Sequence, residues 1–398
     1  MAQVLMEVLP NIHIGNIYIT LPEISDSCRD IVVEKSEFLM QLQSGQEVCL
    51  QLPRGMCLVP DAARSVNHEG QVVTVRVQLD EKTALINTLV ADLMSDSDFQ
   101  SGTEGMSSIP SNIVLSAHCK LCEHQVFECV KFQKVLPLPS VDWEQASEDW
   151  FCHIQKEDGD KLKPASLQPE EDECFYTELF FLLHCNLMDY LEHAKPNAGP
   201  ELKCVKCNLS LGVQIHESIK MWTHNLVWKN EEGDAVYSTD VSKIMLTLFR
   251  NIDKDNFGVN CRLVLQLSSV PKRYLYMVTM NTNQKLLISS EDLQLLHSGR
   301  NEKDNREENL ECAAAKRVRE SGRSEVKLQA VFGVKLLYTE KEGEDEESGE
   351  WADSLHVHLI PCSDSFYKEV KSLLEATNSC LPVNIRFVEK MKVGYIIK

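Results

Sequence analysis

Alternating apolar and polar residues dominate the first 93 positions and predict extended chain. In the clearest case, Val73–Leu79, every second residue is apolar, which is typical of a strand with one buried face. Five runs are expected as strands: Val4–Val8, Ile12–Thr20, Val48–Leu52, Val72–Leu79 and Leu85–Val90. Short strands at this spacing favour an antiparallel sheet or a sandwich. No helix is predicted in this part of the chain.

The rest of the chain repeats the short-strand pattern and adds a few helices. Further strands are expected at Ile113–Ala117, Val126–Phe132, Phe175–Phe181, Leu209–Ile215, Ile219–Trp222, Leu226–Trp228, Cys261–Leu267, Tyr274–Met280, Lys285–Ile288, Val326–Tyr338, Leu355–Ile360, Val383–Val388 and Val393–Ile397. Asn281-Thr282-Asn283 is interpreted as a turn. Helices are expected at Asp142–Trp150, from the N-cap Thr239 to about Asn251, and at Ser365–Ala376.

These elements predict a β-rich α+β fold with antiparallel sheets or sandwich-like lobes and a few short helices. The Gly/Ser-rich stretch after residue 94 separates an N-terminal β domain, residues 1–93, from the rest by a linker, residues 94–111. A central region, residues 112–230, precedes a C-terminal α+β region, residues 231–398. The charged segments 299–324 and 340–351 are expected to be flexible insertions.

Two Cys-x-x-Cys pairs stand far apart in the central region: Cys119 with Cys122, and Cys204 with Cys207. Four thiolates at about 2.3 Å from one ion make a tetrahedral zinc site, so the two pairs predict one zinc clasp. Expected strands flank both pairs, as in zinc knuckles, and a site with four protein ligands is structural because it has no open position. His118, His124 and Cys152-His153 are spare ligands.

Two other interpretations of these cysteines stay open. Fifteen cysteines in 398 residues would give roughly half a Cys-x-x-Cys pair by chance, so buried thiols are an alternative. A redox pair is another, although no thioredoxin-like βαβ pattern surrounds either motif.

Two further cysteines are candidate nucleophiles near the end of the chain. Cys362 lies between an expected strand and the last expected helix, where a helix N-terminus would lower the pKa of its thiol. Cys380 lies in the loop after that helix. Either could form a thioester, and an ordinary cysteine is the alternative for each. No Walker loop, dinucleotide fingerprint, nucleophile elbow or His-Glu-x-x-His motif is present.

Composition narrows the class of protein. The hydrophobic share of 43% is that of a globular protein, and the net charge of −20 argues against direct binding of nucleic acid. An odd number of scattered cysteines without a secretory leader is not a disulfide framework. The longest apolar run, Leu179–Leu183, is too short to cross a membrane. We therefore expect a cytoplasmic protein, with the nucleus as a second location.

Leu136–Trp143 (LPLPSVDW) and Trp150–His153 (WFCH), flanked by the two cysteine pairs, resemble the HECT-like ubiquitin ligase family that binds ubiquitin-conjugating enzymes. The resemblance covers nearly the whole chain. It implies a ubiquitin-protein transferase that accepts ubiquitin from a conjugating enzyme and passes it to substrates, with cyclin B as a suggested partner, or to itself. Asn378–Pro382 (NSCLP) is loosely similar to the loop around the HECT nucleophile, which implies Cys380 as the acceptor and Cys362 as the second choice.

The same family is also linked to the endonuclease of the mRNA 3′-end processing complex. The alternative hypothesis is therefore a non-catalytic binding protein that inhibits or chaperones that endonuclease.

Overall fold

The structure is a computed structural model. It describes residues 3–9, 12–21, 27–80, 108–138, 168–190, 201–215, 217–255, 261–267, 272–289, 291, 323–343 and 357–397. The strand expected at Leu85–Val90, the helix expected at Asp142–Trp150, and most of the expected linker and insertions lie outside these residues. No helix among the described residues is long and apolar enough to cross a membrane.

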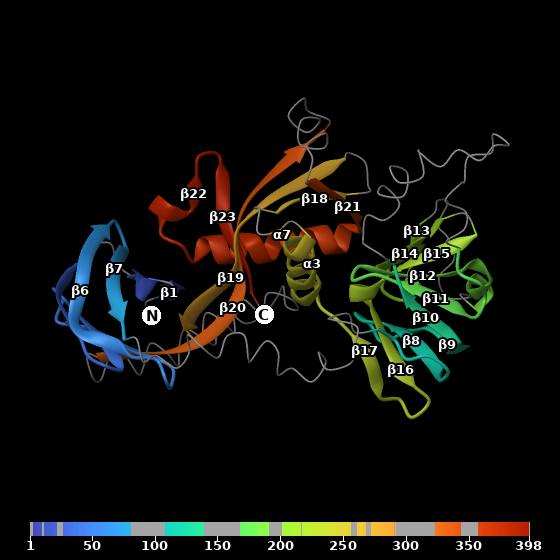
Figure 1. Ribbon diagram of the computed structural model, residues 1–398, viewed down its shortest axis with the longest axis horizontal. Helices are drawn as coiled ribbons and strands as arrows, with labels where there is room; N and C mark the ends of the chain where they lie inside the picture. Colours follow the sequence, from blue (N-terminus) through green and yellow to red (C-terminus); the bar gives the residue numbers. More distant parts are fainter. Residues whose placement is uncertain are drawn as a thin grey trace. The chain divides into compact units, whose positions relative to one another are not determined.

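Strands dominate the described chain (Figure 1), as the sequence predicts. They are β1 (Gln3–Leu9), β2 (Ile14–Thr20), β3 (Cys28–Val33), β4 (Glu37–Leu42), β5 (Glu47–Gln51), β6 (Leu58–Glu69), β7 (Val72–Leu79), β8 (Val114–Cys119), β9 (Gln125–Lys131), β10 (Lys134–Pro137), β11 (Glu173–Tyr176), β12 (Phe180–His184), β13 (Glu201–Lys203), β14 (Ser210–Ile215), β15 (Ser218–Trp222), β16 (Leu226–Asn230), β17 (Ala235–Ser238), β18 (Arg262–Leu267), β19 (Arg273–Ser289), β20 (Arg323–Glu342), β21 (Val357–Cys362), β22 (Phe387–Val388) and β23 (Met391–Ile397). The helices are α3 (Val241–Asp255) and α7 (Asp364–Ser379), with 3-10 turns η5 (Cys185–Tyr190), η6 (Thr223–Asn225) and η7 (Val383–Ile385).

The chain forms two compact units. The first comprises Met1–Ser97, Thr279–Tyr338 and Ser372–Lys398, and the second comprises Asp98–Val278 and Thr339–Lys371. Three of the four unit boundaries fall within β19, β20 and α7. Each unit is assembled from segments that are distant in sequence. The division that the sequence suggests, into residues 1–93, 94–111, 112–230 and 231–398, stays a prediction.

The first unit is built on a sheet with the order β3-β4-β5-β20-β19-β1-β2-β7-β6. The terminal strands of this order, β3 and β6, contact each other, so the sheet curls around its own core. β6 and β7 form a hairpin whose turn contains Gly70 at φ 59°, a left-handed conformation that glycine adopts without strain. β23 pairs with the second half of β20, and β22 pairs with β23.

Strand β1 is buried on both faces. Val4, Met6 and Val8 belong to the core inside the curled sheet, as the two-residue period of a strand requires. Leu5 faces the other way and joins a second core with Leu381 and other residues from β2, β19, β20 and β23. Most residues of β1 are therefore apolar, and its one charged residue is Glu7.

The second unit contains a sandwich of two sheets. A six-stranded sheet has the order β10-β11-β12-β15-β14-β13, and a four-stranded sheet has the order β17-β16-β8-β9. Trp228 of the four-stranded sheet is fully buried and stacks on Phe127 with 6.0 Å between ring centroids. It also meets the edge of Phe181, which belongs to the six-stranded sheet, at 5.7 Å. These aromatic contacts make the shared core of the two sheets.

The structure corrects several predicted elements. The region 281–283 is not a turn, because β19 runs through it: its first part pairs with β18 and its last part with β1. Asn281 is exposed there, which explains polar residues inside a strand. Phe175–Phe181 is not one strand but a hairpin, whose turn is held by Thr177; its hydroxyl accepts the N–H groups of Leu179 and Phe180, each at 3.2 Å.

The ends of two further elements also differ from prediction. The N-cap of α3 is Asp240, not Thr239, since its carboxylate accepts the N–H of Lys243 at 2.8 Å. The segment expected as the strand Val383–Val388 is divided into η7 and the two-residue β22. The sheets are mixed rather than purely antiparallel, because β5 with β20, β10 with β11, and β18 with β21 pair in parallel.

Candidate metal centre and acceptor cysteines

The structure brings the two Cys-x-x-Cys pairs together, as the sequence predicts. The Sγ atoms of Cys119 and Cys207 are 3.5 Å apart, and those of Cys122 and Cys204 are also 3.5 Å apart. All four sulfur atoms lie within 4.8 Å of one another. The short distances connect one pair to the other, which is the arrangement expected when both pairs share one ion.

The two pairs have the same local structure, which we call the two knuckles (residues 119–124 and 204–209). In each, the residue after the motif is left-handed: Glu123 has φ 58° and Asn208 has φ 62°. The N–H of that residue donates to the carbonyl of the first cysteine, at 2.9 Å in one knuckle and 2.8 Å in the other. The N–H of the first cysteine donates to the carbonyl of the residue five positions later, His124 or Leu209. The repeated conformation indicates a common purpose for the two motifs.

Backbone N–H groups point at the sulfur atoms. The thiol of Cys119 is buried, which raises its pKa, while hydrogen bonds from the N–H groups of Cys122 and Leu121 oppose that effect. For Cys122 the balance is reversed: the N–H of His124 and the neighbouring thiols outweigh burial, and the pKa is lowered. Hydrogen bonds of this kind stabilise thiolates, the form that binds metal.

The size of the cluster fits zinc. A tetrahedron with Zn–S distances of about 2.3 Å has S–S edges of about 3.8 Å, and the 3.5 Å pairs and the 4.8 Å limit bracket this length. One knuckle connects β8 with β9 and the other precedes β14, so the cluster links the two sheets of the sandwich. Cys119 and Cys204 are buried in the shared core.

The geometry of the four cysteines also bears on the two alternatives, buried free thiols and a redox pair. None of the described cysteines forms a disulfide, and the close contacts run between the knuckles rather than within either motif, unlike in a Cys-x-x-Cys redox pair. His118 was a spare ligand in the sequence. In the structure its ring contacts the Ser116 hydroxyl at 3.1 Å and the Glu123 carbonyl at 3.3 Å. Within the described residues the metal-ligand group contains cysteines alone, and the spare ligands Cys152 and His153 lie outside those residues.

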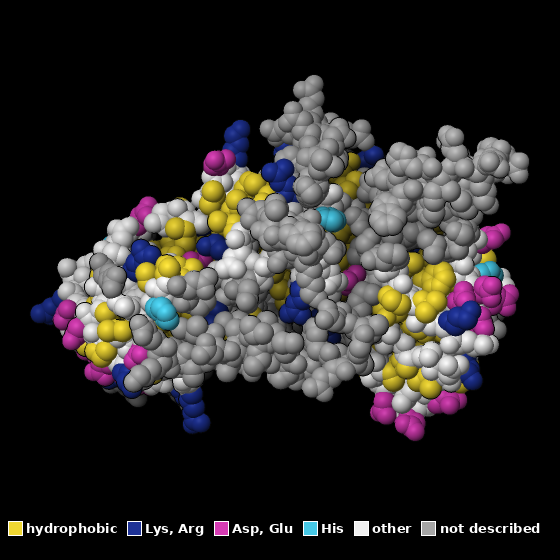
Figure 2. Space-filling view, in the orientation of Figure 1, with side chains coloured by type: hydrophobic (Ala, Val, Ile, Leu, Met, Phe, Trp, Pro, Cys, Tyr) yellow, Lys and Arg dark blue, Asp and Glu magenta, His cyan; other side chains and the backbone are white. Residues whose placement is uncertain are grey.

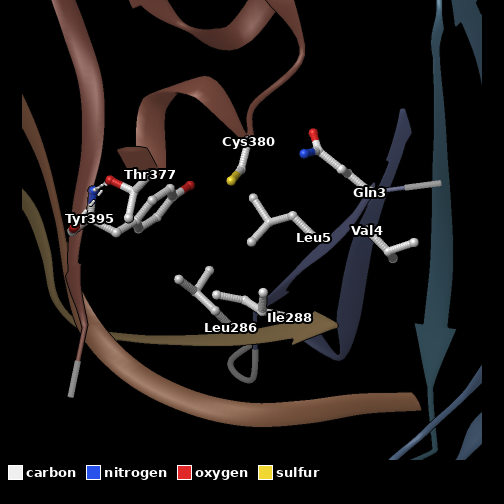
Figure 3. A pocket seen from close by; sticks show the side chains of 8 residues that line it. All are labelled: Gln3, Val4, Leu5, Leu286, Ile288, Thr377, Cys380 and Tyr395. Carbon is white, nitrogen blue, oxygen red and sulfur yellow. Dashed lines mark hydrogen bonds between the residues drawn. The ribbon is translucent and has the colours of Figure 1, made fainter. Parts of the chain in front are cut away.

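Cys380 lies in the turn after α7, half-buried, beside a small cavity of about 10 Å³. Its sulfur points toward Leu5 and Leu286 across this cavity (Figure 3). The thiol donates to the carbonyl of Ala376 at 3.4 Å. Space of this size holds about one water molecule, so the cavity is no binding site for a small ligand.

Arg386 holds the turn around Cys380, which the sequence did not reveal. Its guanidinium donates to the carbonyls of Ser379 at 2.8 Å and Leu381 at 2.6 Å, the residues on either side of Cys380. The amide of Asn378 donates to the carbonyl of Arg386 at 3.0 Å. Nothing in the spacing of these residues signals such contacts, because they depend on how the turn folds back on itself.

Cys362, by contrast, is fully buried at the end of β21. Burial raises the pKa of its thiol, and the nearby carboxylate of Asp364 raises it further. The lowering that a helix N-terminus would cause is therefore not seen, because α7 begins at Asp364 while the sulfur lies in the core. This environment is that of a structural cysteine.

A buried polar cluster with His224 at its centre lies at the start of α7. The His224 ring nitrogen Nε2 is 3.2 Å from the hydroxyls of both Ser363 and Ser365. The Ser363 hydroxyl also accepts the N–H of Phe366 at 3.2 Å, which makes Ser363 the N-cap of the helix. Burial, with a smaller contribution from the charge of Lys120, lowers the pKa of His224 to about 3.

This cluster predicts acid-sensitive stability. Below pH 6.5 the unfolded chain protonates His224 while the folded protein does not, so stability present above pH 6.5 is lost as the pH falls toward about 3. The expected slope is about 1.4 kcal/mol per pH unit. Urea unfolding of the wild type and of His224→Gln at several pH values measures it. The two proteins share every other titrating group, so the difference in their stability should shrink as the pH falls; parallel curves would contradict the prediction.

Comparison with known proteins shows where this fold belongs. The model of the HECT-like ubiquitin-conjugating enzyme (E2)-binding family matches residues 7–393. The chain belongs to this family. A mouse (Mus musculus) protein named as an E3 ubiquitin-protein ligase is 21% identical over 378 residues, covering 92% of this chain and 90% of the mouse protein. Its human (Homo sapiens) counterpart, of the same name, is 23% identical over 364 residues, covering 87% and 86%. No solved structure matches the chain.

Membership of the HECT-like E2-binding family confirms the resemblance noted in the sequence. Of the residues that carried it, Leu136 and Pro137 end strand β10, and Leu138 is buried next to them. The motif residues Ser140, Trp143 and Trp150–His153 lie outside the described part of the chain. The two cysteine pairs, which flank the motif in sequence, lie wholly within the described residues.

Proposed function

We propose that this protein is a ubiquitin-protein transferase that docks a ubiquitin-conjugating enzyme and accepts ubiquitin on Cys380. The family match over residues 7–393 carries the proposal, because the family is described as E2-binding. The relatives, which match over most of their length, are named as ubiquitin ligases. Ubiquitin and cyclin B as partners, and transfer of ubiquitin to the protein itself, stay predictions.

The choice of Cys380 over Cys362 rests on access. A thioester acceptor must meet the carbonyl carbon of a thioester on another protein, and Cys362 is fully buried whereas Cys380 is half-buried in a surface turn. The guanidinium of Arg386, bound to the carbonyls on both sides of Cys380, puts a positive charge in the same turn. These two hydrogen bonds hold the backbone on both sides of the nucleophile in one conformation.

The reaction would follow ordinary thioester exchange. The Cys380 thiolate attacks the carbonyl carbon of ubiquitin's last residue, and the thiolate of the conjugating enzyme leaves as the new thioester forms. A neutral lysine amine of the substrate then attacks the same carbonyl carbon; the isopeptide bond forms as the Cys380 thiolate leaves, and the proton lost by the nitrogen passes to that thiolate or to water. Docking both proteins on one chain supplies the proximity that makes each step efficient.

We further propose that the four-cysteine cluster binds one structural zinc ion. The distances between the sulfur atoms and the repeated knuckles support it. With all four ligands supplied by the chain, the ion would hold the two sheets of the sandwich together and would take no part in transfer.

The second candidate is a non-covalent role. It is favoured by the direction of the Cys380 sulfur, which points into an apolar cavity and donates to a helix carbonyl. In that case the chain would dock its partners without forming a thioester. The partner could be the conjugating enzyme, or the mRNA 3′-end processing endonuclease that the protein would inhibit or chaperone.

Substitution of Cys380 tests the covalent mechanism. When a ubiquitin-loaded conjugating enzyme is mixed with the protein, we expect an adduct that reducing agents cleave, and Cys380→Ala should abolish it. Cys362→Ala, and Cys129→Ala at an exposed cysteine, should leave the adduct intact. The adduct is measured on non-reducing gels with labelled ubiquitin. Ligase activity that persists in the Cys380→Ala, Cys362→Ala double variant would exclude the covalent mechanism and leave the docking role.

A further inference from the structure

Three large apolar side chains are exposed just after the turn that contains Cys380. Val383, Phe387 and Val388 are 67%, 50% and 41% exposed, and we call them the C-terminal patch. They come from η7 and from β22, which contact each other. Figure 2 shows hydrophobic side chains over the region of β22 and β23. Apolar side chains that gather on a surface mark sites of interaction.

The C-terminal patch and Cys380 belong to one braced segment. The guanidinium of Arg386, the residue before Phe387, binds the carbonyls on both sides of Cys380. The Asn378 side chain donates to the carbonyls of Arg386 at 3.0 Å and Val393 at 2.7 Å, which connects the end of α7 to β23. β22 is paired with β23 at Phe387 and Val388. The position of the patch relative to the thiol is therefore fixed by hydrogen bonds, as a binding surface requires.

We propose that the C-terminal patch holds the folded body of ubiquitin while the C-terminus of ubiquitin is linked to Cys380. The inference rests on the proposed function, in which Cys380 is the acceptor. Once the thioester has formed, ubiquitin is tethered at Cys380 whatever the docking site of the conjugating enzyme. A surface that begins three residues from the thiol is therefore within reach of the tethered protein.

The size of the patch fits a tethered partner rather than a free one. Stable complexes bury about 800 Å² on each partner, more than three side chains provide. A short tether raises the effective concentration to the order of millimolar, so weak apolar contacts are enough. We therefore expect free ubiquitin not to bind at micromolar concentration. Ubiquitin attached to Cys380 should cover the patch.

Hydrogen exchange on a chemically linked adduct tests this directly. Ubiquitin with a C-terminal thiol, activated as a disulfide, is coupled to Cys380 in the full chain carrying Cys129→Ser, and peptide masses confirm the site. The reference protein carries a small aminoethanethiol disulfide at Cys380. We expect slower amide exchange across residues 386–392 in the ubiquitin adduct than in the reference. Equal exchange in the two adducts would overturn the proposal.

Variants of the patch give a second test. Phe387→Ser with Val388→Ser should slow ubiquitin transfer on the order of tenfold, with affinity for the unloaded conjugating enzyme unchanged. Val66→Ser removes an apolar side chain of similar exposure, 51%, from β6 of the same unit and should change neither property. Weaker binding of the unloaded conjugating enzyme would assign the patch to that enzyme instead.

The two proposals fail separately. The adduct for hydrogen exchange is made chemically, so exchange across the patch can be measured whether or not Cys380 accepts ubiquitin from an enzyme. Failure of Cys380→Ala to abolish the transfer adduct would refute the acceptor role. Unchanged exchange in the linked adduct would refute the role of the patch.

Discussion

Loss of the zinc ion that we propose for the four-cysteine clasp is expected to destabilise the protein more than any single core substitution. Binding of a structural zinc ion contributes on the order of 10 kcal/mol to folding, because the site forms only in the folded chain. Here the ion would link two knuckles that are more than 80 residues apart and belong to opposite sheets of the sandwich. Metal analysis of the purified protein should give about one zinc per chain.

Cys204→Ser and treatment with a chelator should both lower the unfolding temperature of the sandwich. Cys174→Ser is the matched control, since Cys174 is also fully buried in the same core but is not part of the clasp. Cys174→Ser should change only the packing and polarity of the core, which lowers the free energy of unfolding by a few kcal/mol at most. Two results together would refute the zinc site: purified protein that contains no metal, and a Cys204→Ser variant that is no less stable than Cys174→Ser.

The clasp could be predicted from the sequence because the pattern that specifies each knuckle spans only a few neighbouring residues. Two cysteines separated by two residues, with strands on both sides, specify a knuckle without knowledge of the remaining fold. The requirement that one ion takes four ligands then predicts a contact between residues 119–122 and 204–207, and the structure confirms that contact. Asn208, a residue that tolerates the left-handed conformation, was a signal that could have strengthened the prediction.

Features that depend on distant packing could not be predicted in the same way. β19 was expected as two strands because Asn281-Thr282-Asn283 has the composition of a turn, yet each half of the strand has a pairing partner of its own. The strand β6 was missed because it is polar, interrupted by bulges and located at the edge of its sheet. At Cys362 the local effect of the helix N-terminus was outweighed by burial, which tertiary structure alone determines.

Glu7 is the clearest example of a feature that the sequence does not reveal. It lies in an apolar strand and is 4% exposed, so an isolated charge there would be unfavourable. The Lys335 ammonium is 2.7 Å from one carboxylate oxygen, and the Tyr395 hydroxyl donates to the same oxygen. The Tyr18 hydroxyl donates to the other at 3.2 Å. These partners come from β2, β20 and β23, up to 388 positions away in sequence.

Glu7→Ala is therefore expected to destabilise the first unit by about 3–5 kcal/mol. The variant leaves the partly buried Lys335 ammonium without its counter-charge and two phenols without their acceptor. Burial, and then the charge of Glu7, raises the pKa of both Tyr18 and Tyr395, so at neutral pH these phenols are protonated donors that need the carboxylate. Urea unfolding measures the loss of stability, and hydrogen exchange of the β1 amides shows whether it affects the first unit.

A second substitution separates the charge pair from simple loss of packing. In the Glu7→Leu, Lys335→Met double variant no uncompensated charge remains, and apolar replacement of a buried ion pair is often neutral or stabilising. The double variant should therefore be more stable than Glu7→Leu alone, with a coupling free energy above about 1 kcal/mol. Additive losses would show that the charges of Glu7 and Lys335 do not stabilise each other. Coupling would show that one carboxylate holds the N-terminal strand against the segment that leads from Cys380 to the end of the described chain.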